Sequence, residues 1–123
     1  MKGFLFAIAL ALFAVPAMAQ DKAAEGVALT PVKTELVCMV NDAVFAKPQI
    51  PVEVNGKTYY GCCHMCKERL AKDITVRMAT DPVSGKQVDK ADAVIGQTAD
   101  GRAFYFESAE NLKSYRVPVY SSR

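Results

Sequence analysis

The segment from Cys62 to Cys66 holds three of the four cysteines of the chain and its single histidine. It reads Cys62-Cys63-His64-Met65-Cys66. Thiolates and imidazole are common ligands of Zn(II), and thiolates with thioethers suit Cu(I). The fourth cysteine, Cys38, lies well upstream, so a hairpin must bring it back before the four thiols can meet. The spacing therefore predicts a metal site and also constrains the fold.

The expected site binds one metal ion, either Zn(II) or Cu(I). Its favoured ligands are Cys38, Cys62 and Cys66, with Cys63 or His64 as a fourth member and Met39 or Met65 as weaker candidates. A closed shell of four thiolates, or of three thiolates and an imidazole, favours zinc in a structural role. Three thiolates in an open site favour copper and its transfer. The sequence leaves both possibilities open.

The N-terminal segment predicts export from the cell. Lys2 gives a positive start, and an apolar run from Phe4 to Val15 ends at Pro16. Ala17-Met18-Ala19 then supplies the small-residue pattern of a signal peptidase site, so residues 1–19 are expected to be a cleaved signal peptide. The run is shorter than the roughly 20 residues that span a bilayer. We expect a periplasmic or secreted protein that does not contact the membrane after cleavage.

Two other uses of the cysteines fit the same residues. In an oxidising compartment an even number of cysteines permits structural disulfides, such as Cys38 with Cys66, in a small structural or interaction module. The adjacent pair Cys62-Cys63 argues against this, because neighbouring cysteines pair only in a strained geometry. The C-x-x-C spacing of Cys63 and Cys66 is also a redox motif, so a thiol-disulfide oxidoreductase is the enzyme alternative. The thioredoxin βαβ context is missing, and we expect a binding protein, not an enzyme.

Composition excludes several further classes. The chain has 15 Lys and Arg against 13 Asp and Glu, without clusters, which argues against a nucleic-acid surface. No Gly-rich phosphate loop or G-x-S-x-G elbow is present in the sequence. The carboxylates Asp73, Asp81, Asp89 and Asp92 lack the spacing of a general acid-base pair. A hydrolase or a nucleotide-binding enzyme is therefore not expected.

An internal repeat indicates how the cysteines are positioned. Residues 55–62 match residues 100–107 position by position at an offset of 45 residues, beginning with Asn55-Gly56 and Asp100-Gly101. We infer two copies of one unit, at residues 34–77 and 78–123, after a flexible leader at residues 20–33. Folding is expected to start near Thr34.

Each unit is predicted to be a hairpin followed by a helix. In the first, Asn55-Gly56 predicts a tight primed turn between two strands, and residues 63–72 predict a helix. In the second, strands at residues 93–97 and 103–106 flank Asp100-Gly101 in the same way, and Ser108 is a plausible N-cap of the next helix. A short final strand is expected around residues 117–120.

The first unit resembles the TRASH and YHS metal-binding modules. The shared pattern is a single cysteine, Cys38, then a hairpin ending in Tyr59-Tyr60, then Cys62-Cys63-x-x-Cys66 opening a short helix. Asp81-Pro82-Val83-Ser84-Gly85 similarly resembles the opening of a second YHS-type module, so the likeness covers about residues 36–116. It implies an α+β fold of two tandem treble-clef-like modules. It also implies a role in metal sensing, trafficking or resistance.

The second unit lacks the metal ligands of the family. Ser84, Glu107 and Asn111 stand at its cysteine positions, and Ser108 stands opposite Cys63. Such groups do not replace thiolates for a soft ion, so this unit is expected to be a packing partner with its aromatic residues in the core. With one loaded site and no output domain, storage, delivery or sequestration fits better than sensing. Delivery would require a metal-transport protein or a metalloprotein as partner.

Overall fold

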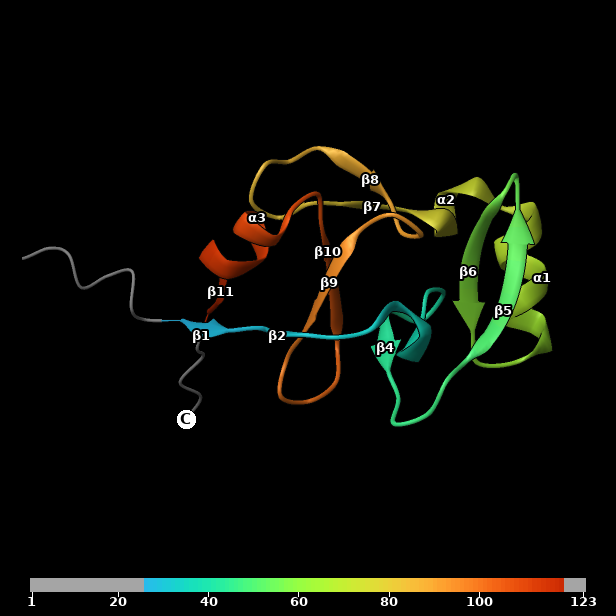
Figure 1. The fold of residues 1–123 in the computed structure, drawn as a ribbon, viewed down its shortest axis with the longest axis horizontal. Coiled ribbons are helices and arrows are strands. Elements are labelled where there is room, and N and C mark those ends of the chain that lie inside the picture. The colour runs from blue at the N-terminus through green and yellow to red at the C-terminus, as the bar shows by residue number, and fades with distance from the viewer. Residues whose placement is uncertain (1–25, 119–123) are drawn as a thin grey trace, which may run out of the picture.

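The computed structural model describes residues 26–118 and shows a mixed α+β fold of small sheets and three α-helices (Figure 1). The first half contains η2 (Thr34–Leu36), β3 (Val37–Cys38), β4 (Ala43–Val44), β5 (Ile50–Val54), β6 (Lys57–Gly61), α1 (His64–Lys72) and α2 (Ile74–Arg77). The second half contains β7 (Met78–Thr80), β8 (Gln87–Asp89), β9 (Val94–Gln97), β10 (Ala103–Phe106), α3 (Ala109–Ser114) and β11 (Arg116–Val117). The predicted signal peptide lies outside the described residues, and no helix among those described is long and apolar enough to cross a membrane.

The same order of elements occurs twice along the chain. A short antiparallel strand pair is followed by an antiparallel hairpin and then by a helix, first as β3–β4, β5–β6 and α1, and then as β7–β8, β9–β10 and α3. We call these the N-terminal and C-terminal units. Figure 1 shows the hairpin and helix of the N-terminal unit at one end of the long axis, and α3 toward the other. Every sheet is small, so packing between units must supply much of the stability.

The first hairpin is confirmed in detail. Val54 pairs with Lys57, which leaves Asn55 and Gly56 as a two-residue turn with φ values of 51° and 83°. Two positive φ angles are the signature of the primed turn that the Asn-Gly dipeptide predicts. The inner positions Val52 and Tyr59 lie opposite each other and are buried. This hairpin gives α1 a rigid apolar surface on which to pack.

The second hairpin has the predicted strands, but its turn is not the two-residue turn of the first hairpin. Gln97 pairs with Ala103, so Asp100 and Gly101 belong to a loop of residues 98–102 and not to a two-residue turn. Thr98 closes this loop, because its hydroxyl accepts a hydrogen bond from the Arg102 N–H at 2.9 Å and its carbonyl accepts one from Gly101 at 3.0 Å. The longer loop lets the Gly101 carbonyl accept a hydrogen bond from Val44 of β4 at 2.8 Å.

Part of the predicted leader is folded. In β1 (Val27–Ala28) the chain pairs with β11, and in β2 (Thr30–Pro31) it adds a third strand to β9 and β10. Between them Leu29 is buried, and at Gly96 of β9 an added Cβ would lie 3.0 Å from the Leu29 Cβ. The expectation that folding starts near Thr34 is therefore wrong, because the free edge of β9 and the Leu29 pocket order the chain earlier. The final strand is Arg116–Val117, and residues 119–120 lie outside the described chain.

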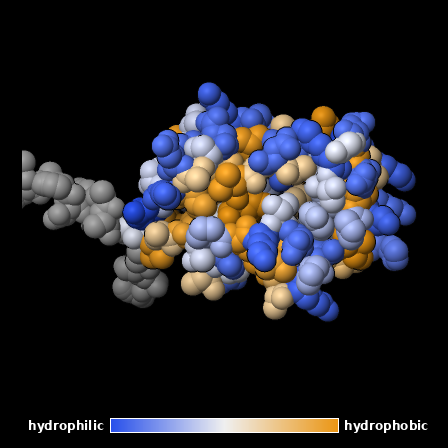
Figure 2. Space-filling model, viewed as in Figure 1, coloured by the Kyte–Doolittle hydropathy of each residue, from blue (hydrophilic) through white to orange (hydrophobic). Residues whose placement is uncertain are grey.

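One apolar core joins the two units. Its buried members come from both halves: Val37, Met39, Val52, Tyr59, Leu70, Ile95, Ala103 and Tyr105. A smaller cluster of Leu29, Phe106 and Leu112 lies under α3. The expectation that the second-unit aromatics are core residues is confirmed for Tyr105 and Phe106. Figure 2 shows that hydrophobic residues also reach the surface over β9 and β10, in the middle of the face in view.

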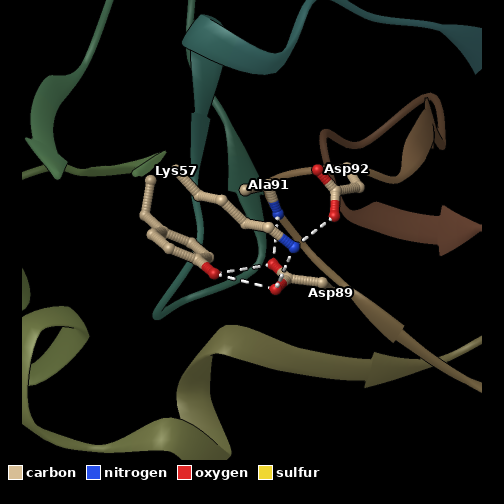
Figure 3. Close-up of polar contacts among 5 residues, drawn as sticks. Lys57, Asp89, Ala91 and Asp92 are labelled. Atoms are coloured by element: carbon tan, nitrogen blue, oxygen red, sulfur yellow. Dashed lines mark hydrogen bonds and ion pairs between the residues drawn. The ribbon is translucent and has the colours of Figure 1, made fainter. Parts of the chain in front are cut away.

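A polar cluster ties the first hairpin to the loop after β8 (Figure 3). The Lys57 ammonium contacts Asp92 at 2.6 Å and Asp89 at 3.2 Å, while the Tyr59 hydroxyl donates to Asp89 at 2.7 Å. Although burial acts to raise the pKa of Asp89, the hydrogen bonds from Tyr59, from the Ala91 N–H and from Lys57 lower it overall. The N-terminal and C-terminal units are thus held together by charge as well as by apolar packing.

Candidate metal centre

Cys38 is brought to the cysteine cluster by a tight return of the chain. It ends the short strand β3, whose Val37 pairs with Val44, and the turn between them includes Asp42 at a φ of 55°. The Met39 N–H donates to the Tyr60 carbonyl at 2.8 Å, which fixes the turn to β6. Cys38 is fully buried as a result, beside the point where β6 runs into α1.

The other three cysteines lie where β6 ends and α1 begins. Cys63 is the N-cap residue of α1, and Cys66 is buried on the first turn on the same face as Leu70. At Gly61, the last residue of β6, an added Cβ would lie 2.9 Å from the Cys66 Cβ. Glycine therefore allows the strand end to approach the helix closely enough for Cys62 and Cys66 to share one site.

Three sulfur atoms form a compact group. The Cys66 Sγ lies 3.9 Å from the Cys38 Sγ and 3.8 Å from the Cys62 Sγ, and all three sulfurs lie within 4.8 Å of one another. A disulfide bond would require about 2.05 Å. All four cysteines carry free thiols in the structure, including the Cys38 and Cys66 pair considered for a disulfide. Cys38, Cys62 and Cys66 are thus close enough to bind a metal ion together.

The remaining predicted ligands lie at the edge of this group or away from it. Cys63 is exposed, and its Sγ lies 3.6 Å from the Cys66 Sγ without belonging to the three-sulfur group. His64 is exposed at the start of α1 and does not join the group either. The side chain of Met65 is exposed, with 75% of the residue accessible, whereas Met39 is fully buried in the core.

Burial and hydrogen bonding shift the pKa values of the thiols in different directions. Burial acts to raise the pKa of Cys38, but N–H groups of Asn41 and Val40 donate to its sulfur and lower the pKa overall. Burial and the neighbouring thiols raise the pKa of Cys66 to about 12. The pKa of Cys63 is lowered, chiefly by the backbone N–H of Cys66. A bound cation would stabilise all of these thiolates together.

Sequence reasoning missed a buried lysine behind the site. The Lys90 ammonium is buried, and it donates to the Met39 carbonyl at 2.7 Å and to the Asp42 carboxylate at 3.0 Å. Tyr105 donates its hydroxyl to the same carboxylate at 2.8 Å. Lysines are rarely buried unless paired, so nothing in the local pattern around Lys90 indicates this position. Through these bonds the C-terminal unit holds the turn that follows Cys38.

At the corresponding junction of the C-terminal unit, where β10 leads into α3, the buried polar group is Asp81, a carboxylate for which the sequence predicted no site. Its carboxylate is fully buried and accepts hydrogen bonds from the Glu107 N–H at 2.8 Å and the Asn111 amide at 2.9 Å. It also accepts from the N–H groups of Val83 at 2.7 Å and Ser84 at 3.2 Å. Although burial acts to raise the pKa of Asp81, these four donors lower it overall.

The positions predicted to match the cysteines behave differently from one another. Glu107 and Asn111 do lie together, because both contact Asp81. Ser108 caps α3 as predicted, accepting from the Asn111 N–H at 3.1 Å. Ser84 instead uses its hydroxyl locally, where it accepts from the Lys86 N–H at 3.2 Å. The Asn111 side chain therefore contacts Asp81 and not Ser84. The only sequence signal for this position was the Asp-Pro-x-Ser-Gly turn.

A surface groove opens beside the cysteine cluster. It has a volume of about 470 Å³. Its lining residues are Val40, Asn41, Cys63, Met65, Cys66, Glu68, Arg69, Lys72 and Asp73. Cys63 and Cys66 thus border the groove, while Cys38 and Cys62 do not.

Comparisons with protein-family models, with curated proteins and with solved structures find no match. The resemblance to TRASH and YHS modules therefore rests on the residues of this chain alone.

Proposed function

We propose that this protein binds one soft metal ion, Zn(II) or Cu(I), through Cys38, Cys62 and Cys66. The observation that carries the proposal is the spacing of the sulfurs. Metal–sulfur bonds of about 2.3 Å at tetrahedral angles place two sulfurs about 3.8 Å apart. The measured separations from the Cys66 Sγ are 3.9 Å and 3.8 Å. An ion could therefore enter with little movement of the protein.

We further propose that the two units are tandem treble-clef-like modules of the TRASH and YHS type. The repeated order of strand pair, hairpin and helix supports this, as does the position of the cysteines at the first turn of α1. In this interpretation the N-terminal unit is the loaded copy. The C-terminal unit supports it through the shared core and through Lys90.

The proposed role is metal trafficking, storage or resistance in the periplasm or outside the cell. The signal-like N-terminal segment supports the compartment. The site supports the role, because Cys62 and Cys63 are exposed and a groove reaches Cys66. Structural zinc sites are usually closed by four ligands, whereas here the shared group has three. An accessible site of this kind suits an ion that is passed on.

Native mass spectrometry of the protein purified anaerobically from its own compartment tests the proposal. We expect one metal ion per chain and four thiols that react with a thiol reagent after the metal is removed. A metal-free protein that is lighter by two or four hydrogens would contradict metal binding and would establish disulfides. The mass of the N-terminus in the same spectrum reports whether residues 1–19 have been removed.

A thiol-disulfide oxidoreductase is the second candidate, and one observation favours it. Cys63 is exposed and Cys66 is buried, with their sulfurs 3.6 Å apart at the start of a helix. An accessible attacking thiol next to a buried resolving thiol is the arrangement that dithiol exchange needs. Turnover with an external disulfide substrate would establish this activity. If the protein binds stoichiometric metal and shows no such turnover, only the metal-binding proposal remains.

A further inference from the structure

The thiol of Cys63 has no fixed role in the three-sulfur group. It caps α1 with an extended backbone, at φ −157° and ψ 174°, yet its side chain makes no capping hydrogen bond to the helix. Its sulfur has a close neighbour in Cys66, at 3.6 Å, but does not join Cys38 and Cys62. The helix start therefore presents an exposed soft donor that is within reach of the site but is not part of it.

The groove gives one route to the site, and that route passes this same thiol. The groove beside the cluster is lined by Cys63 and Cys66, while Cys38 is buried beneath them. Cys62 is exposed but does not line the groove, and the Asn41 amide contacts its sulfur at 3.6 Å. Cys66 is thus the one thiol shared by the group and the groove. A ligand that approaches through the groove meets the Cys63–Cys66 pair before the other sulfurs.

We propose that Cys63 is an exchange ligand, which takes the ion from the Cys38–Cys62–Cys66 group and presents it, with Cys66, to an incoming thiolate in the groove. This inference rests on the metal-binding function proposed above. It also assigns Cys63 a role other than fourth ligand of a closed shell. Because exchange proceeds through a shared sulfur, the ion is never released to water.

The exchange needs no oxidant or reductant. Cys63 loses its proton to water as its sulfur bonds to the ion, and the bond from the ion to Cys62 breaks, so that Cys62 takes up a proton. An incoming thiol then loses its proton as it bonds to the ion, and the bond to Cys63 breaks with uptake of a proton. Two further incoming thiols displace Cys38 and Cys66 in the same way, each losing a proton as it bonds to the ion while the displaced cysteine takes one up. Net charge and metal oxidation state are conserved, and the ion is then held by the incoming thiolates.

A matched pair of variants tests the assignment. Cys63→Ser and Cys62→Ser each remove one exposed thiol, one from the groove and one from the three-sulfur group. Each full-length protein is loaded anaerobically with Zn(II) or Cu(I) alone. Affinity is then measured by competition with a chromophoric chelator. Release is measured as the rate of transfer to that chelator at increasing concentrations of glutathione, a small thiol that can enter the groove.

We expect Cys63→Ser to bind one ion with an affinity within about threefold of the parent, while its glutathione-dependent release slows by at least about tenfold, equivalent to 1.4 kcal/mol of barrier. Cys62→Ser should instead lose affinity. If Cys63→Ser no longer binds one ion, Cys63 is a permanent ligand of the site and the assignment is wrong. If Cys63→Ser releases the ion as fast as the parent, Cys63 has no role in exchange and the assignment is also wrong. A parent protein that binds neither ion would instead refute the proposed function itself.

Discussion

The N-terminal and C-terminal units both contain a hairpin followed by a helix, but different side chains meet where the hairpin joins the helix. In the N-terminal unit the strand pair, hairpin and helix converge on the sulfurs of Cys38, Cys62 and Cys66. In the C-terminal unit they converge on the Asp81 carboxylate, with Asn111 and the Glu107 N–H as partners. The first junction is a set of like sulfur ligands, which a cation would hold together. The second is a set of donors around one acceptor, and it is complete by itself.

The difference shows two solutions to one physical problem. A short helix on a small hairpin buries little apolar surface, so the junction needs a specific crosslink. In the proposed function a metal ion would supply that crosslink only while it is bound, because free thiols at these separations make weak contacts. A buried carboxylate with four hydrogen bonds supplies it permanently. We therefore expect the N-terminal unit to respond to metal and the C-terminal unit to ignore it.

The largest expected effect comes from removing the central thiol. Cys66→Ser should abolish stoichiometric metal binding, because Cys66 is the neighbour shared by all the other sulfurs. The loss of affinity should exceed the roughly 100-fold that removal of an outer-shell partner costs. Competition with a chromophoric chelator measures it. Ser84→Ala in the C-terminal unit is the matched control and should bind metal normally; retained binding in the Cys66 variant would refute the site.

A smaller but substantial effect is expected at the other junction. Asp81→Ala leaves buried donors around Asp81 without an acceptor, and each such group costs about 1–3 kcal/mol, so we expect a loss of at least about 3 kcal/mol in the free energy of unfolding. Urea denaturation of the metal-free protein measures it. Ser84→Ala should change stability by less than about 0.5 kcal/mol. A nearly neutral Asp81→Ala would show that the carboxylate is not the crosslink of this unit.

The smallest expected effect is a change in how much folding stability the protein loses in acid when Asp81 is replaced. The pKa of Asp81 is lowered in the fold from its ordinary value of 3.8, so the native state favours the ionised carboxylate. The resulting stability is present above pH 3.8 and is lost as the pH falls through the lower native pKa. Asp81→Asn should therefore be less stable at neutral pH and show a shallower loss of stability in acid. An unchanged acid profile would mean that other carboxylates govern it.

Local sequence signals predicted the elements that local chemistry specifies. Asn55-Gly56 predicted its turn because only residues that tolerate positive φ close a two-residue hairpin. The helix predicted at residues 63–72 is confirmed as α1, in which Cys66 and Leu70 are buried one helical turn apart. The close approach of Cys38 followed from the hairpin that must return it. These features depend on residues near one another along the chain.

The features that were missed depend on distant partners. Asp81 looked like an ordinary turn residue, and its contacts with Glu107 and Asn111 cross most of a unit. Lys90 gave no sign that it would be buried against the turn after Cys38. The strands at residues 27–31 are too short to show a period, and they form because β9 and β11 offer open edges. Residue spacing along the chain does not predict contacts between residues this far apart.

The pairing of β1 with β11 has a practical consequence. Val27 lies opposite Val117, so the two ends of the described chain leave the molecule at the same edge. In Figure 1 this edge lies at the opposite end of the molecule from α1, whose first turn carries the cysteines. An affinity tag or a surface linker at either end would therefore hold the protein with its thiols facing away from the support. Immobilised protein could then be offered metal, or a candidate acceptor, without the attachment blocking access.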